Sequence, residues 1–89
     1  MKRLSYSVRG YLVAYDLKAE AREDGRGAVP SRPLRVIKKL IEGGDVERIQ
    51  YSVLLVKSER ALGMVLSVLE PYALSIVVAG PVEVRVTFP

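Results

Sequence analysis

The sequence predicts an α+β domain in which two helices cover one face of a small sheet. Two observations predict it. Segments with helical spacing of apolar residues alternate with strand-like segments, and 89 residues are too few for a doubly wound sheet. A chain of this length forms one domain, 1–89, and buries somewhat more than about 60% of its unfolded surface. A second layer over a sheet is feasible, whereas a deep enclosed cavity is not expected.

The first strand is expected over residues 11–17, because residues 12–14 form an apolar run. Residues 1–9 are a basic lead-in, in which Tyr6 and Val8 alternate as in a strand, and Gly10 separates them from the main strand. Residues 18–32 then combine charged residues with glycines and almost no large apolar side chain. They are expected to form an extended, exposed and mobile loop, with a functional role and plain disorder as equal alternatives.

Two helices are expected from apolar residues at helical spacing. The first starts at Ser31, whose hydroxyl is a candidate cap, and stops at the Gly43-Gly44 pair. The second follows a cap at Ser58 and ends near Pro71. Their apolar stripes are Leu34, Ile37, Leu40 and Ile41 in the first helix, and Leu62, Val65, Leu66 and Leu69 in the second.

The remaining strands complete the predicted order. Residues 46–56 are strand-like and are expected to bend into two strands at about Ser52. A short buried strand at 74–79 is followed by a Gly-Pro break and by a last, alternating strand at 82–88. This order is that of a ferredoxin-like βαββαβ sandwich with an added C-terminal strand.

The composition limits the chemistry. The chain has no cysteine and no histidine, which excludes disulfides and thiol catalysis and argues against structural zinc and imidazole chemistry. An enzyme with this composition would use carboxylates, hydroxyls, cations and a hard metal ion. The net charge of +4 favours a polyanionic partner where the basic residues share one face. The absence of asparagine, beside many charged residues, is typical of proteins from thermophiles.

The sequence also predicts a location. The N-terminal residues lack the apolar core of a signal peptide, and no apolar run reaches the roughly 18 residues of a membrane span. We therefore expect a cytoplasmic protein without a membrane partner.

Asp16 is the sharpest chemical feature, because it places a carboxylate where the first strand should stop. A strand that ends on an acidic residue holds that residue in a fixed position, as a metal ligand or general base requires. The alternative is an aspartate that closes a turn through its own backbone.

Two motifs carry a resemblance to a known family. Tyr15-Asp16-Leu17 follows an apolar run, and Arg48-Ile49-Gln50-Tyr51-Ser52-Val53 follows an amphipathic helix that ends in glycine. The chain in this respect resembles the small ferredoxin-like CRISPR-associated family, which partners the CRISPR integrase in antiviral defence. Some members of that family are metal-dependent endonucleases.

The resemblance implies roles for four residues. Asp16 corresponds to the family's metal-binding and catalytic aspartate, and Tyr15, Arg35 and Arg48 correspond to nucleic-acid-binding positions. The implied cofactor is Mg²⁺ or Mn²⁺. A magnesium ion takes one or two protein carboxylates, so a single Asp16 suffices where a homodimer brings two together. For Arg48, a solvated strand arginine is the alternative.

Two classes of function remain open. The first is a divalent-metal-dependent endonuclease of the spacer-acquisition machinery, a hydrolase acting on RNA or DNA phosphodiesters. The second is a non-catalytic dimeric DNA-binding scaffold that bridges integrase subunits. A regulatory domain that binds a small molecule is a third. In the dimer, we expect residues 82–88 to pair with a sheet edge of the partner chain, because an unpaired apolar edge strand invites association.

Overall fold

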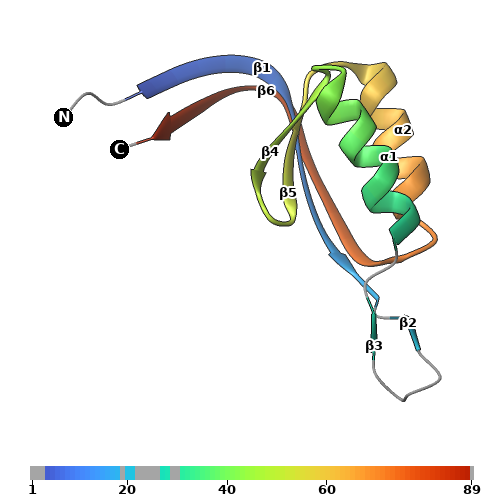
Figure 1. Cartoon of the computed structure of the whole chain (residues 1–89). Helices are drawn as coiled ribbons and strands as arrows, with labels where there is room; N and C mark the ends of the chain where they lie inside the picture. Colours follow the sequence, from blue (N-terminus) through green and yellow to red (C-terminus); the bar gives the residue numbers. More distant parts are fainter. Residues whose placement is uncertain (1–3, 19, 22–26, 29–30, 89) are drawn as a thin grey trace.

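The computed structural model describes residues 4–18, 20–21, 27–28 and 31–88. It is an α+β arrangement of a four-stranded antiparallel sheet and two helices, which confirms the predicted class (Figure 1). The strand order in the sheet is β4-β5-β1-β6, and both helices lie on one face of it. The elements of this layer pair are β1 (Leu4–Leu17), α1 (Ser31–Glu42), β4 (Val46–Gln50), β5 (Val53–Val56), α2 (Glu59–Leu69) and β6 (Ala73–Phe88).

The helices form where the apolar stripes predict them. The cap predicted for α2 is confirmed, since Oγ of Ser58 accepts a 3.1 Å hydrogen bond from the backbone N–H of Ala61. Such a cap satisfies a backbone donor that the first turn of a helix leaves unpaired. In α1, by contrast, Ser31 is itself the first helical residue. The predicted start of the helix at Ser31 is confirmed, so Ser31 and Arg32 are helical although the expected loop was drawn to residue 32.

The core lies between the helices and the sheet. Its central side chains are fully buried and come from every main element except β6, which contributes the half-buried Ile76 at its edge. Burial of this kind stabilises a domain by roughly 25 cal/mol per Å² of apolar surface. The buried cluster consists of Val13, Tyr15, Ile37, Val46, Leu54, Val56, Ala61, Val65 and Leu69.

The segment 46–56 divides as predicted. Strand β4 ends at Gln50 and β5 begins at Val53, with a tight turn of two residues between them. Within the pair, Val46 lies opposite Val56 and Gln50 lies opposite Val53. The bend at Ser52 is therefore confirmed.

The first strand is longer than predicted. β1 starts at Leu4 and runs through Gly10 without interruption. Gly10 continues the strand because it lies where another backbone comes close, since a Cβ at this position would be 2.5 Å from the carbonyl oxygen of Val56. The absence of a side chain thus allows close packing, and the separation expected at Gly10 is wrong.

The last strand is also continuous. The added C-terminal strand is wrong, because Gly80 and Pro81 lie within β6 rather than between two strands. They are absorbed by a shift of register, with Gly10 opposite Val82 and Leu12 opposite Ala79. Gly80 has a φ of +128°, which residues with a side chain rarely adopt.

Residues 4–10 and 82–88 form a two-stranded extension, which we call the ribbon. The pairing of β1 with β5 ends at Tyr11 and Val56, whereas its pairing with β6 continues to Leu4 and Phe88. Figure 1 shows the ribbon curving away from the helices. Residues 82–88 pair with residues 4–10 of their own chain, and the predicted pairing with a partner chain stays a prediction.

The segment between β1 and α1 is described only in part. β2 (Glu20–Ala21) and β3 (Gly27–Ala28) pair with each other as a separate two-stranded sheet. The rest of the predicted mobile loop, at 19, 22–26 and 29–30, lies outside the described residues. No helix in the described part of the chain is long and apolar enough to cross a membrane.

Candidate nucleic-acid interface

Asp16 lies near the carboxyl end of β1, which is flanked by β5 and β6 in the sheet. It is exposed and lies opposite Ser75 of β6. Its neighbour Tyr15 is buried among the helices, so alternation along the strand places Asp16 on the opposite face. Asp16 borders a hollow of about 160 Å³, and the strand position predicted for it is confirmed.

The hollow beside Asp16 also contains an exposed aromatic ring. Its walls include Leu34 from α1 and the β4–β5 turn residues Tyr51 and Ser52. Tyr51 is 76% exposed, although it is a large ring. Exposed aromatic rings provide stacking surfaces for nucleobases. A carboxylate and a free ring thus border the same hollow.

Tyr15 and Arg48 are brought together by the fold. Nη1 of Arg48 donates a 3.3 Å hydrogen bond to the hydroxyl of Tyr15 and another to the backbone carbonyl of Tyr51. The Tyr15 hydroxyl itself lies 3.4 Å from that carbonyl oxygen. The ring of Tyr15 is 7% exposed and belongs to the core. Both side chains therefore hold the β4–β5 turn, and Arg48 is more than a solvated strand arginine.

Arg35 lies elsewhere. It is exposed on α1 and borders a second hollow, of about 240 Å³, together with Arg32, Val36 and Lys39. The wall that α1 contributes to the Asp16 hollow is Leu34 rather than Arg35. The structure thus separates the cationic surface of α1 from the carboxylate.

Asp16 is an acidic side chain on the border of the hollow of about 160 Å³ and is a candidate metal ligand. Among the residues that the structure describes, no three acidic side chains gather closely enough to hold an ion. The exposed carboxylate of Asp16 is the kind of ligand that a magnesium ion takes, since Mg²⁺ binds one or two protein carboxylates and completes its shell with water and phosphate.

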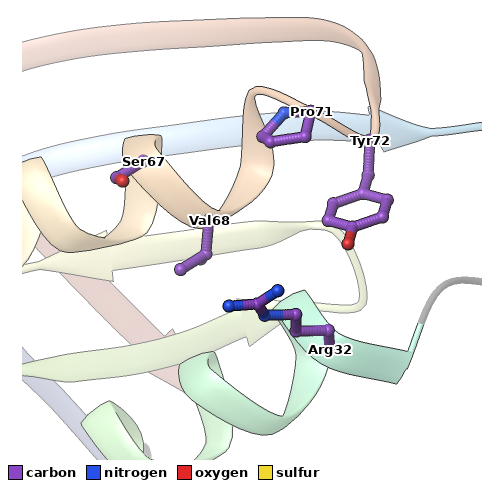
Figure 2. A pocket seen from close by; sticks show the side chains of 5 residues that line it. All are labelled: Arg32, Ser67, Val68, Pro71 and Tyr72. Carbon is purple, nitrogen blue, oxygen red and sulfur yellow. The ribbon is translucent and has the colours of Figure 1, made fainter.

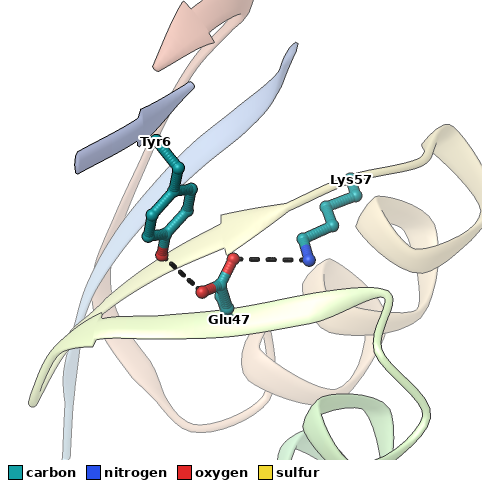
Figure 3. Close-up of polar contacts among 3 residues, drawn as sticks. All are labelled: Tyr6, Glu47 and Lys57. Carbon is teal, nitrogen blue, oxygen red and sulfur yellow. Dashed lines mark hydrogen bonds and ion pairs between the residues drawn. The ribbon is translucent and has the colours of Figure 1, made fainter. Parts of the chain in front are cut away.

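A further polar cluster, which the sequence did not indicate, joins the ribbon to the β4–β5 hairpin (Figure 3). The Tyr6 hydroxyl donates to Oε1 of Glu47, and Nζ of Lys57 lies 3.3 Å from Oε2 of the same carboxylate. The hydrogen bond from Tyr6, and then Lys57, lower the pKa of Glu47. The same hydrogen bond raises the pKa of Tyr6. Both shifts have this one hydrogen bond as their main cause, since it favours the charged form of Glu47 and the neutral form of Tyr6 in the folded state.

The sheet face away from the helices is apolar beside Asp16. Leu12 and Ala14 alternate with the buried Val13 and so lie on this face, half-buried. Their partners across β6 are Ala79 and Val77, of which Val77 is 62% exposed. We call this surface the open face.

No family model, no curated protein and no solved structure matches this chain.

Proposed function

We propose that the chain is a homodimeric, divalent-metal-dependent endonuclease of the CRISPR spacer-acquisition kind, acting on RNA or DNA. The proposal rests on the Tyr15-Asp16-Leu17 and Arg48-to-Val53 motifs and on one structural observation. Asp16 is exposed at the end of a central strand, on the same side of the sheet as the apolar open face. A second copy that covered the open face would therefore bring its own Asp16 toward this one and supply a second carboxylate.

The open face supports the dimer. Val77 of β6 is 62% exposed and lies opposite Ala14 of β1, and Ala79 lies opposite the half-buried Leu12. Contiguous apolar surface of this kind marks an interaction site. A two-fold axis through the open face pairs identical patches, because such an interface is self-complementary. It would set the two Asp16 carboxylates on either side of that axis.

The chemistry follows from this pairing. A Mg²⁺ or Mn²⁺ ion held by two Asp16 carboxylates would lower the pKa of a bound water and polarise a phosphoryl oxygen. The chain's own contribution is to place the nucleic acid. Tyr51 offers a stacking ring beside Asp16, and Arg35 with the other cations of α1 offers charge for phosphate oxygens.

The proposal includes a ferredoxin-like sandwich as the finer description of the fold. It is supported by the order of the elements, in which a long strand, a helix, a hairpin, a second helix and a last strand follow one another. The resemblance implies the same arrangement.

A second candidate is a non-catalytic dimeric scaffold that binds DNA and bridges integrase subunits. One observation favours it, namely that Asp16 has no cluster of further acidic ligands among the described residues. The dimer and the cationic surface of α1 serve this function equally well.

A cleavage assay separates the two candidates. The purified protein is incubated with labelled RNA and DNA in Mg²⁺, Mn²⁺ or chelator. The endonuclease predicts cleavage with metal, loss of cleavage with chelator, and loss in Asp16→Asn. Asp45→Asn is a matched control, because Asp45 is also exposed and lies outside the hollow. Tight binding without cleavage by the parent protein assigns the scaffold instead.

A further inference from the structure

A hollow of about 210 Å³ lies where the start of α1 meets the end of α2 (Figure 2). In Figure 2, Arg32 projects into it from α1, and Tyr72 projects from the opposite side with its hydroxyl toward Arg32. Its other walls are Ser67, Val68 and Pro71. The hollow thus combines a guanidinium, an aromatic ring, a hydroxyl and apolar surface.

The backbone holds Tyr72 in place. Its N–H donates a 2.9 Å hydrogen bond to the carbonyl of Leu69, and its own carbonyl accepts a 2.7 Å bond from the N–H of Lys18. The first bond closes the turn after α2, and the second ties that turn to the end of β1. These two bonds fix the backbone of Tyr72 and so the point from which its ring projects.

Arg32 also belongs to the hollow that Arg35 and Lys39 border, so the two hollows are adjacent. These three cations follow one another at helical spacing on the surface of α1, and the first turn of α1 has no acidic residue. Within the described part of the chain, none of the three forms an ion pair. As far as the structure describes the chain, the second hollow is therefore a cationic surface without an acidic partner, and it adjoins the aromatic hollow.

We propose that these two hollows together bind a nucleoside phosphate, with the base against Tyr72 and Arg32 and the phosphate at Arg35 and Lys39. Nucleobases stack on aromatic rings and on guanidinium planes, and phosphate oxygens accept charge-assisted hydrogen bonds from cations. The site deepens the proposed function, because it rests on nucleic acid being the partner.

The orientation follows from which side chains line each hollow. The aromatic ring of Tyr72 borders only the first hollow, whereas Arg35 and Lys39 border only the second. The base therefore takes the first hollow and the phosphate takes the second. A single hollow of about 210 Å³ is smaller than the roughly 300 Å³ at which small-molecule sites begin, so the ligand must extend into both.

The first test uses adenosine 5′-monophosphate and ribose 5-phosphate as probes, and NMR titration measures the binding of each. We expect adenosine 5′-monophosphate to shift the Tyr72 ring and Arg32 Nε resonances. Removing the base should weaken binding roughly five- to 150-fold, which is the contribution of stacking one base. Equal affinity for the two probes, or no shift at Tyr72, overturns the proposal.

Variants locate the site. Arg32→Gln and Tyr72→Leu should both weaken adenosine 5′-monophosphate binding at least several-fold. Arg60→Gln, the same change at an exposed arginine outside both hollows, should not. Thermal unfolding checks that the variants fold. Arg32 is exposed, so Arg32→Gln decides the outcome even if Tyr72→Leu is unstable, and unchanged binding in Arg32→Gln overturns the proposal.

The source of the ligand is identified with a short oligonucleotide. Tighter binding of its 5′-phosphorylated form than of its 5′-hydroxyl form identifies the end of a strand, and binding of the mononucleotide alone identifies a free nucleotide. Binding of neither overturns the site. Asp16→Asn separates this inference from the proposed function, because it should abolish cleavage and leave nucleotide binding unchanged.

Discussion

The Tyr6 hydroxyl donates a 2.5 Å hydrogen bond to Oε1 of Glu47, a residue 41 positions further along the chain. Tyr6 belongs to the ribbon and Glu47 to β4, which are not neighbouring strands of the sheet. The bond therefore fixes the direction of the ribbon relative to the β4–β5 hairpin. Lys57, at the end of that hairpin, holds the other oxygen of the same carboxylate (Figure 3).

This relationship predicts a dependence of stability on pH. The pKa of Glu47 is lowered in the folded state, so its contribution is present above about pH 4.5 and is lost as the pH falls further. The pKa of Tyr6 is raised, so its contribution is present below pH 10 and is lost as the pH rises through the folded value. Urea unfolding of the parent protein at a series of pH values should show the free energy of unfolding falling at both ends, in an acid limb and in an alkaline limb.

Two variants show which residue causes each pH-dependent loss of stability. Tyr6→Phe should lower the urea midpoint at pH 7 and flatten both limbs, because it removes the shared hydrogen bond. Glu47→Gln should flatten the acid limb. Unchanged pH profiles in both variants would show that the bond contributes nothing to stability.

Gly10→Ala should destabilise the protein by about 1–3 kcal/mol, the usual cost of overpacking. The new methyl group would lie 2.5 Å from the backbone oxygen of Val56, which cannot move as a flexible side chain can. Gly63→Ala is the matched control, because a Cβ in α2 at that position meets nothing within 4 Å. It should stabilise the helix by about 0.5–1 kcal/mol. Chemical unfolding of both variants measures the two changes in the free energy of unfolding, which should have opposite signs.

Arg48→Gln should cost about 0.5–1.5 kcal/mol for each hydrogen bond lost, because it releases both the Tyr15 hydroxyl and the Tyr51 carbonyl. A double-mutant cycle with Tyr15→Phe measures the coupling between the two side chains. Additive effects would mean that the two residues act independently.

Val77→Lys should dissociate the proposed dimer, since it places a charge in the centre of the open face. Light scattering at micromolar concentration should give a dimer for the parent protein and a monomer for the variant. Met64→Lys on α2 is the control, because Met64 is also exposed but lies in the helix layer. A monomeric parent protein would remove the basis for a shared metal site.

The sequence predicted those features whose signals are local. The cap at Ser58 and the turn at Tyr51 and Ser52 depend on neighbouring residues, and the structure confirms both. The position of Asp16 at the end of a strand follows equally from the apolar run before it. These patterns could be recognised without knowing which strands pair.

The features that were missed depend on distant partners. Residues 4–10 were interpreted as a lead-in because the strand that pairs with them, 82–88, lies at the other end of the chain. Without that partner, residues 82–88 were assigned to a second copy. The approach of Arg32 to Tyr72 likewise depends on the antiparallel packing of α1 and α2, for which neither segment alone carries a signal.

The pairing of β1 with β6 has a consequence for synthesis on the ribosome. Residues 11–14 find β5 once the middle of the chain has emerged, whereas residues 4–10 pair only with residues 82–88. Contacts between such distant segments form late, because the loop between them must close first. During translation, the first half of β1 therefore remains unpaired, and its backbone donors and acceptors have no strand partner. Chaperones that bind extended segments would compete for it until the last strand is released.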